Sequence, residues 1–160
     1  GMMKKLSNNT ACVFTGKCLS FGGSMIRPEA TGYCLVYFTD AMLQRQGMCF
    51  EGMRVAVSGS GNVAQYTIEK ALELDARVIT VSDSGGTLGD EDGFTTEKLA
   101  HLAESKNQRY GRVADYARER GLTYLAGQQP WNVPVDIALP CATQNELDLE
   151  AAQTLIRNGG

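Results

Sequence analysis

The chain has 160 residues, of which 43 % are hydrophobic and 21 % charged, a composition that fits one globular α/β domain. A formal net charge of −3, with basic residues scattered along the chain, argues against nucleic acid as a partner. The sequence shows no apolar run of membrane-spanning length and no signal-peptide core, so we expect a cytoplasmic protein with no membrane partner.

The N-terminal part is predicted to lead into the domain. Residues 1–26 are polar and punctuated by glycine, and we expect a connecting segment there, with a strand and turn within 14–24. A helix is predicted from Arg27 to Gly47, because Pro28 suits its first turn and Glu29 lies beside the positive end of its dipole.

Apolar strands and an amphipathic helix come next. Residues 53–59 and 76–83 are rich in β-branched residues without clear alternation, as expected of parallel strands covered on both faces. Between them, Ala64, Ile68 and Leu72 recur at helical spacing. This order predicts one right-handed βαβ unit.

The second half is predicted to add two helices and two strands, at 95–106, 112–121, 122–127 and 135–140. Thr143 and Glu146 have capping-box spacing for a terminal helix that carries Leu147, Ala151 and Leu155 on one face. The predicted fold is therefore α/β: a Rossmann-like parallel sheet flanked by helices, incomplete at the C-terminal end where another strand would normally follow.

The segment 58–64, SGSGNVA, has the form of a phosphate-binding turn. Gly59 and Gly61 follow a predicted strand and open a predicted helix, and Asp83 ends the next strand about 20 residues later. One glycine allows the tight turn, the next lets the backbone approach a pyrophosphate, and the small Ala64 lets helix and strand pack closely. In this context we predict a dinucleotide site, although glycines alone would fit an ordinary turn.

The residues leave the choice between NAD and NADP open. Asp83 would bond the adenosine ribose and favour NAD, because its charge repels a 2′-phosphate. Ser84 and the cations Lys106 and Arg109 could instead receive that phosphate. The two cations also fit a simpler interpretation as solvated charges at a helix end.

The cysteine pattern predicts no metal site. The chain has five cysteines and one histidine, and no two cysteines form a Cys-x-x-Cys pair. We expect buried, reduced thiols at Cys12, Cys18, Cys34, Cys49 and Cys141.

Four strings carry a resemblance: KKLSNNTACVFTGK (4–17), SFGGSMIRPEATGY (20–33), SGSGNVAQY (58–66) and PVDIALPCATQNELD (134–148). They are similar to the cofactor domain of NADP-dependent glutamate dehydrogenases of the hexameric bacterial type. That family converts 2-oxoglutarate, ammonia and NADPH to L-glutamate. Lys106 and Arg109 lie where its NADP-preferring members carry phosphate-binding cations, which moves the preference from NAD to NADP.

The resemblance also implies that the family's catalytic residues are not among these 160 residues. The family's catalytic lysine and aspartate lie in a substrate domain upstream, so residues 1–26 would connect to it and 27–160 would form a truncated dinucleotide-binding domain. We assign no catalytic residue and expect no turnover by the isolated chain. The alternative is a non-catalytic NAD(P)-binding or structural remnant that forms a homo-oligomer through an exposed sheet edge.

Cofactor-binding roles follow from the resemblance position by position. Thr31 would bind the nicotinamide carboxamide, with Arg27 nearby, and Ala142 with Thr143 would line the nicotinamide ribose pocket. The pyrophosphate would lie on residues 60–63. The full predicted set is Arg27, Thr31, Gly59, Ser60, Gly61, Asn62, Val63, Asp83, Ser84, Lys106, Arg109, Ala142 and Thr143.

Four positions depart from the family's usual glycine: Cys18, Cys34, Cys49 and Asp75. We expect Asp75 to cap a helix in the left-handed conformation, which aspartate adopts at lower cost than most residues. Cys34 lies in the first helix, where a side chain is expected to push apart a close contact that glycine would allow.

Overall fold

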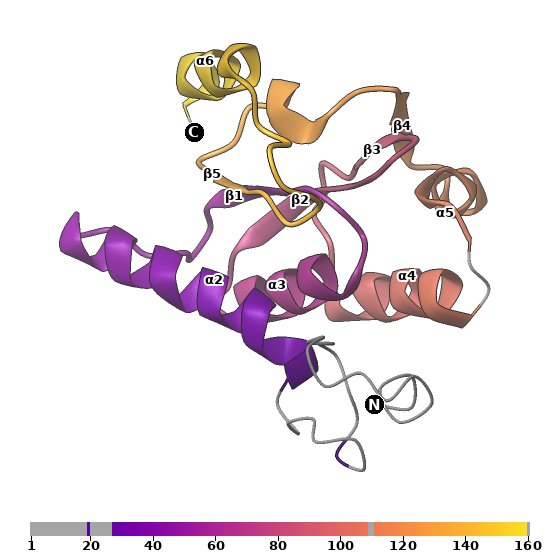
Figure 1. The fold of residues 1–160 in the computed structure, drawn as a ribbon, viewed down its shortest axis with the longest axis horizontal. Helices are drawn as coiled ribbons and strands as arrows, with labels where there is room; N and C mark the ends of the chain where they lie inside the picture. Colours follow the sequence, from indigo (N-terminus) through magenta and orange to yellow (C-terminus); the bar gives the residue numbers. More distant parts are fainter. Residues whose placement is uncertain (1–18, 20–26, 109–110, 160) are drawn as a thin grey trace, which may run out of the picture.

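The computed structural model describes residues 19, 27–108 and 111–159 (Figure 1). The strand and turn expected within 14–24 lie outside this part, as do Cys12, Cys18 and Arg109. The elements are α2 (Arg27–Arg45), β1 (Arg54–Val57), α3 (Asn62–Glu73), β2 (Arg77–Asp83), β3 (Gly86–Gly89), α4 (Thr96–Gln108), α5 (Val113–Arg120), β4 (Thr123–Ala126), the 3₁₀ helix η2 (Pro130–Asn132), β5 (Ile137–Leu139) and α6 (Leu149–Asn158).

A five-stranded sheet in the order β4-β3-β2-β1-β5 forms the centre of the molecule. Strand β1 runs parallel to both β2 and β5, which confirms the predicted Rossmann-like unit. The sheet is mixed, because β3 pairs antiparallel with β2 and β4 pairs antiparallel with β3. Strand β3 was not predicted from the sequence; it has four residues and begins and ends with glycine.

Helices cover both faces of the sheet (Figure 1). On one face α2, α3 and α4 pack over a large apolar cluster that includes Val36, Ile68 and Leu102. On the other face η2 and α6 pack over a smaller cluster centred on Trp131 and Leu155. A sheet buried on both faces explains why strands β1 and β2 are apolar without alternation.

The predicted cap of the terminal helix is wrong. Helix α6 begins at Leu149, and its cap is Asp148, whose side chain accepts a hydrogen bond from the amide of Ala151 at 2.8 Å. Glu146 turns back instead and accepts from the amide of Ala142 at 3.0 Å. This local contact, together with the left-handed Asn145 (φ 58°), holds the preceding residues in turns rather than helix.

Asp75 adopts the predicted left-handed conformation, with φ 59°, directly after the C-cap of α3. The expectation for Cys34 is wrong, because its side chain is exposed to solvent. The close helix contact lies two residues earlier, at Gly32. Cys49 is also exposed rather than buried, and only Cys141 among the described cysteines is partly buried.

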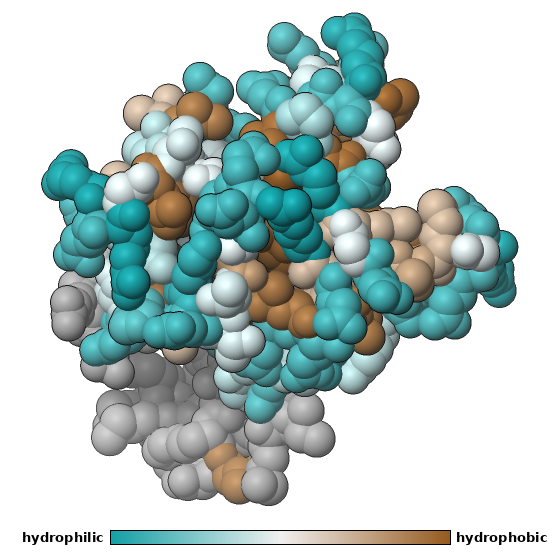
Figure 2. All heavy atoms as spheres, turned by 180° about the vertical axis from the view of Figure 1, so that it is seen from behind, coloured by the Kyte–Doolittle hydropathy of each residue, from teal (hydrophilic) through white to brown (hydrophobic). Residues whose placement is uncertain are grey.

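The outer side of α2 carries apolar side chains in contact with solvent. Phe38 is 66 % exposed and Met42 50 % exposed. Figure 2 shows this apolar surface from behind, along the part of the helix that projects from the body. None of the described helices is long and apolar enough to cross a membrane.

Candidate functional site

Three loops meet where the parallel strands end. Because β1, β2 and β5 run in the same direction, their carboxyl ends share one edge of the sheet. Ser82 of β2 accepts a hydrogen bond from the amide of Gly59 after β1, at 2.8 Å. Ser58 accepts from the amide of Cys141 after β5, also at 2.8 Å. These buried hydroxyls fix the turn after β1 to strand β2 and to the loop after β5.

The turn after β1 requires its first glycine. Gly59 has φ +83°, and a Cβ there would lie 3.1 Å from Cα of Ala142 and 3.2 Å from the carbonyl oxygen of Cys141. Both contacts are with backbone atoms, so the close approach of the β5 loop depends on the missing side chain. The predicted small residue of the motif, Ala64, is completely buried between helix and sheet.

The N-terminus of α3 is open to an anion. Its cap, Gly61, has extended backbone, makes no side-chain capping bond, and would leave even an added Cβ without any atom within 4 Å. No acidic residue lies in the first turn of α3. The first turn of α3 therefore lacks a side-chain cap and a neighbouring carboxylate, and a helix start of this kind, with free amides and the positive dipole, is the arrangement that binds phosphate groups.

Asp83 lies at the end of β2 and is already engaged. Its Oδ1 accepts from the amide of Gly85 at 2.8 Å, and its Oδ2 accepts from the amide of Val113 at 3.0 Å. Lys106 of α4 places its ammonium 3.8 Å from the same Oδ2. The cation offsets the negative charge of Asp83, so this carboxylate repels a nearby phosphate less than an isolated one would.

Arg112 is a candidate that the sequence analysis missed. Its guanidinium donates to the hydroxyl of Ser84 at 3.1 Å, directly beyond Asp83. Arg112 is the N-cap of α5, where the helix dipole disfavours a cation. A cation at such an unfavourable position is the feature of the sequence that could have indicated a binding role. Together, Lys106 and Arg112 place two positive charges beside Asp83 and Ser84.

The start of α2 lies beside the start of α3. The side-chain amide of Asn62 donates to the carbonyl oxygen of Pro28 at 2.6 Å. Thr31 is exposed on α2 one turn further along. Arg27 is the first residue of α2, and its side chain lies outside the described part.

The structure thus brings most of the predicted positions to one edge of the sheet. Ser60 is buried under the glycine turn, Val63 is half-buried, and Ala142 and Thr143 are exposed in the loop after β5. Arg109 is the predicted residue that this part of the chain does not place. Among residues 27–108 and 111–159, no three His, Cys, Asp or Glu side chains gather as metal ligands.

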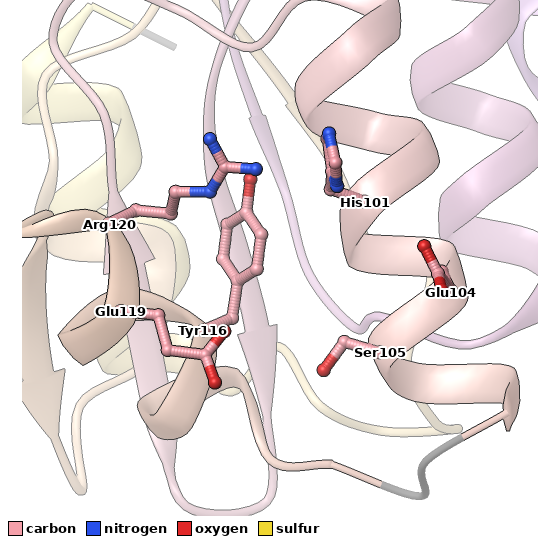
Figure 3. Close-up of a pocket in the computed structure, with 6 residues that line it drawn as sticks. All are labelled: His101, Glu104, Ser105, Tyr116, Glu119 and Arg120. Atoms are coloured by element: carbon pink, nitrogen blue, oxygen red, sulfur yellow. The ribbon is translucent and has the colours of Figure 1, made fainter.

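Further cavities lie among the described residues. The one in Figure 3 lies between α4 and α5, has a volume of about 50 Å³, and is lined by His101, Glu104, Ser105, Tyr116, Glu119 and Arg120. That volume suits a water or two rather than a nucleotide. A cavity of about 280 Å³ lies between η2 and α6. Another, of about 290 Å³, lies between α3 and α4.

Cys141 is expected to resist alkylation. Burial raises the pKa of its thiol to about 11, and a hydrogen bond with Thr67 at 3.5 Å offsets part of that shift. At pH 8 we expect iodoacetamide to label the exposed Cys34 and to spare Cys141, as measured by peptide mass spectrometry. Equal labelling of Cys141 and Cys34 at pH 8 would contradict the burial of Cys141.

The raised pKa of Cys141 also predicts that the free energy of unfolding falls between about pH 8.5 and 11, because in that range only the unfolded chain loses the thiol proton.

Comparison with known proteins places this site in context. Residues 22–160 match the family described as Glutamate/Leucine/Phenylalanine/Valine dehydrogenase. The chain is 92 % identical over 159 residues to an "NADP-specific glutamate dehydrogenase" from an unknown prokaryotic organism, covering 99 % of this chain and 35 % of that protein. It is 78 % identical to the protein of that name from Escherichia coli (strain K12), covering 99 % of this chain and 36 % of that protein.

A solved structure agrees with the sequence matches. The glutamate dehydrogenase of Plasmodium falciparum superimposes with a TM-score of 0.85 at 43 % identity, over 98 % of this chain and 34 % of that chain. The present chain thus spans about a third of the length of the relatives it matches. With the family match extending over nearly all of its residues, the chain belongs to the Glutamate/Leucine/Phenylalanine/Valine dehydrogenase family.

Proposed function

We propose that residues 27–160 form the dinucleotide-binding domain of an NADP-dependent glutamate dehydrogenase. The observation that carries this proposal is the N-terminus of α3, which has no side-chain cap, together with two cations, Lys106 and Arg112, that contact Asp83 and Ser84 at the end of β2. The names of the 92 % and 78 % identical relatives support the same cofactor. NADP is the preferred cofactor, and NAD is the alternative.

The cofactor would lie across the ends of the parallel strands. Its pyrophosphate would accept hydrogen bonds from the amides at the start of α3, from Gly61 to Val63. Its adenosine ribose would lie at Asp83, with the 2′-phosphate between Lys106, Arg112 and, by resemblance, Arg109. The nicotinamide half would then extend past Gly59 toward the loop after β5 and the start of α2.

The remaining predicted residues would serve that nicotinamide half. We propose Thr31 as the partner of the carboxamide, with Arg27 close to it, and Ala142 and Thr143 as the wall of the ribose pocket. The hydrogen bond from Asn62 to Pro28 supports this arrangement, because it joins the helix that carries Thr31 to the phosphate-binding turn.

The whole enzyme would catalyse the reductive amination of 2-oxoglutarate by ammonia and NADPH to give L-glutamate. That reaction needs an acid or base at the imine carbon and nitrogen. All lysines in the described residues are paired with carboxylates, at Lys70, Lys98 and Lys106, so none is the unpaired, desolvated amine that such catalysis uses. We therefore propose that this chain alone binds the cofactor without turnover.

The test combines binding and turnover in one sample. NADPH fluorescence is expected to change on titration with the chain, whereas adding 2-oxoglutarate and ammonium is expected to leave NADPH absorbance constant. Absence of a fluorescence change at millimolar cofactor would overturn the proposed function. Consumption of NADPH above the buffer rate would instead overturn the proposed lack of turnover.

Self-association stays a prediction. Strands β4 and β5 end the sheet on its two sides within the described residues, and each offers one edge to a further strand. Sedimentation of the purified chain distinguishes a homo-oligomer from a monomer. The cytoplasmic location likewise stays a prediction from the sequence.

A further inference from the structure

Helices α2 and α3 cross with their backbones in direct contact. A Cβ on Gly32 would lie 2.8 Å from the amide nitrogen of Thr67 and 2.8 Å from the carbonyl oxygen of Val63. Real Cβ atoms do not approach other heavy atoms this closely, so α2 reaches its position only because residue 32 has no side chain. Val63 belongs to the first turn of α3, which is also the proposed pyrophosphate site.

Side chains of α2 and α3 contact one another beside this crossing. The hydroxyl of Tyr33 donates a hydrogen bond to the carboxylate of Glu69 on α3. The ring of Tyr33 packs edge-on against Tyr66, with 5.9 Å between centroids, and the ammonium of Lys70 lies 4.3 Å from the centroid of the Tyr33 ring. The hydrogen bond to Glu69, followed by burial, raises the pKa of Tyr33 to about 12, so the hydroxyl remains a donor at neutral pH.

These contacts hold two parts of the site at a fixed spacing. Thr31 precedes Gly32 and Tyr33 on α2, and the Gly61 turn opens α3. The hydrogen bond from Asn62 to Pro28 joins the same two helices at their starts. Any tilt of α2 on α3 would therefore move Thr31 relative to the phosphate-binding turn, while the end of β2 at Asp83 stays in the sheet.

We propose that Tyr33 and Glu69 are positioning residues that fix the span between the adenosine half and the nicotinamide half of the site. The inference rests on the proposed function, because it assumes that one dinucleotide contacts both helices. A ligand that spans both halves gains from this pre-organisation. A ligand that occupies only the adenosine half, such as adenosine 2′,5′-bisphosphate, does not.

The experiment compares those two ligands in the same variants. In Tyr33→Phe, which removes the hydroxyl, we expect the Kd for NADP⁺ to rise about fivefold to tenfold, because a hydrogen bond to a carboxylate is lost. The Kd for adenosine 2′,5′-bisphosphate is expected to change less than about twofold. Glu69→Gln, which weakens the same bond, is expected to give a smaller change in the same direction.

A matched control and a double variant sharpen the test. Tyr37→Phe removes a tyrosine hydroxyl from the next turn of the same helix, where the side chain is 54 % exposed, and is expected to leave both affinities unchanged. The double variant Tyr33→Phe with Glu69→Gln is expected to match Tyr33→Phe alone, since both changes break one interaction. Thermal unfolding of each variant checks that it is folded.

The affinities of the variants for the two ligands distinguish a positioning role of Tyr33 from a general loss of binding. A change in the ratio of the two affinities, in Tyr33→Phe but not in Tyr37→Phe, supports the inference. Equal weakening of both ligands, or unchanged binding of NADP⁺, overturns it while leaving the proposed function standing. Failure of the wild-type chain to bind either ligand overturns the proposed function and the inference together.

Discussion

Among the glycines that the structure describes, and apart from those with positive φ, Gly32 is the position where a change to alanine is expected to destabilise the chain most. The added Cβ would meet backbone atoms of Thr67 and Val63 at 2.8 Å and the Cβ of Tyr66 at 2.9 Å. Backbone atoms inside a helix cannot turn away as a side chain can, so α2 must move off α3. Overpacking of this kind costs about 1–3 kcal/mol.

The expected result is a melting temperature lower by several degrees, about 2–8 °C for a domain of this size, measured by circular dichroism. Gly89→Ala is the matched control, because no atom lies within 4 Å of a Cβ at that strand position. NADP⁺ binding is expected to weaken in Gly32→Ala, since the displaced α2 carries Thr31 with it. A melting temperature equal to that of the wild type would show that the helices do not cross as closely as described.

Arg112→Glu is expected to remove the preference for NADP⁺ over NAD⁺. The guanidinium lies 3.1 Å from the hydroxyl of Ser84, and Lys106 lies beside Asp83, so both cations face the proposed 2′-phosphate. Reversing the charge replaces an attraction with a repulsion, and we expect the affinity for NADP⁺ to fall by about tenfold to a hundredfold. The affinity for NAD⁺, which lacks the phosphate, is expected to change little.

The control for this prediction is Arg157→Glu, the same change of charge at an exposed position on α6. Folding of Arg112→Glu is expected to be normal, because a glutamate directly before α5 suits the helix dipole. Calorimetric titration with each cofactor gives the two affinities. A loss shared equally by NADP⁺ and NAD⁺ would assign Arg112 a structural role instead.

Much of the fold could be predicted because its signals are local. Strands β1 and β2 carry continuous β-branched runs, and the helix between them has apolar residues at regular spacing. The antiparallel strand β3 could not be found in this way. Its sequence, GTLG, has too few side chains for a pattern, and it forms because Gly86, with φ +152°, pairs with Ala126 where a Cβ would meet backbone atoms.

The candidate site was predictable where a motif has fixed spacing, as with Gly59, Gly61 and Asp83. Contacts between distant segments were not. Arg112 reaches Ser84 across 28 positions, and only the folded chain shows that pairing. The close helix contact was expected at Cys34 and lies at Gly32. The sequence does not show which side of α2 packs against α3, so it could not tell which of the two positions faces the neighbouring helix.

Calorimetric titration of the purified chain with NADP⁺ and with NAD⁺, at the same ionic strength, tests whether the edge of the sheet holds a dinucleotide and which one it prefers. The open start of α3 and the cations at Lys106 and Arg112 predict saturable binding of NADP⁺, about tenfold or more tighter than that of NAD⁺. No binding of either cofactor at millimolar concentration would rule out the dinucleotide site, and tighter binding of NAD⁺ would rule out the roles given to Lys106 and Arg112.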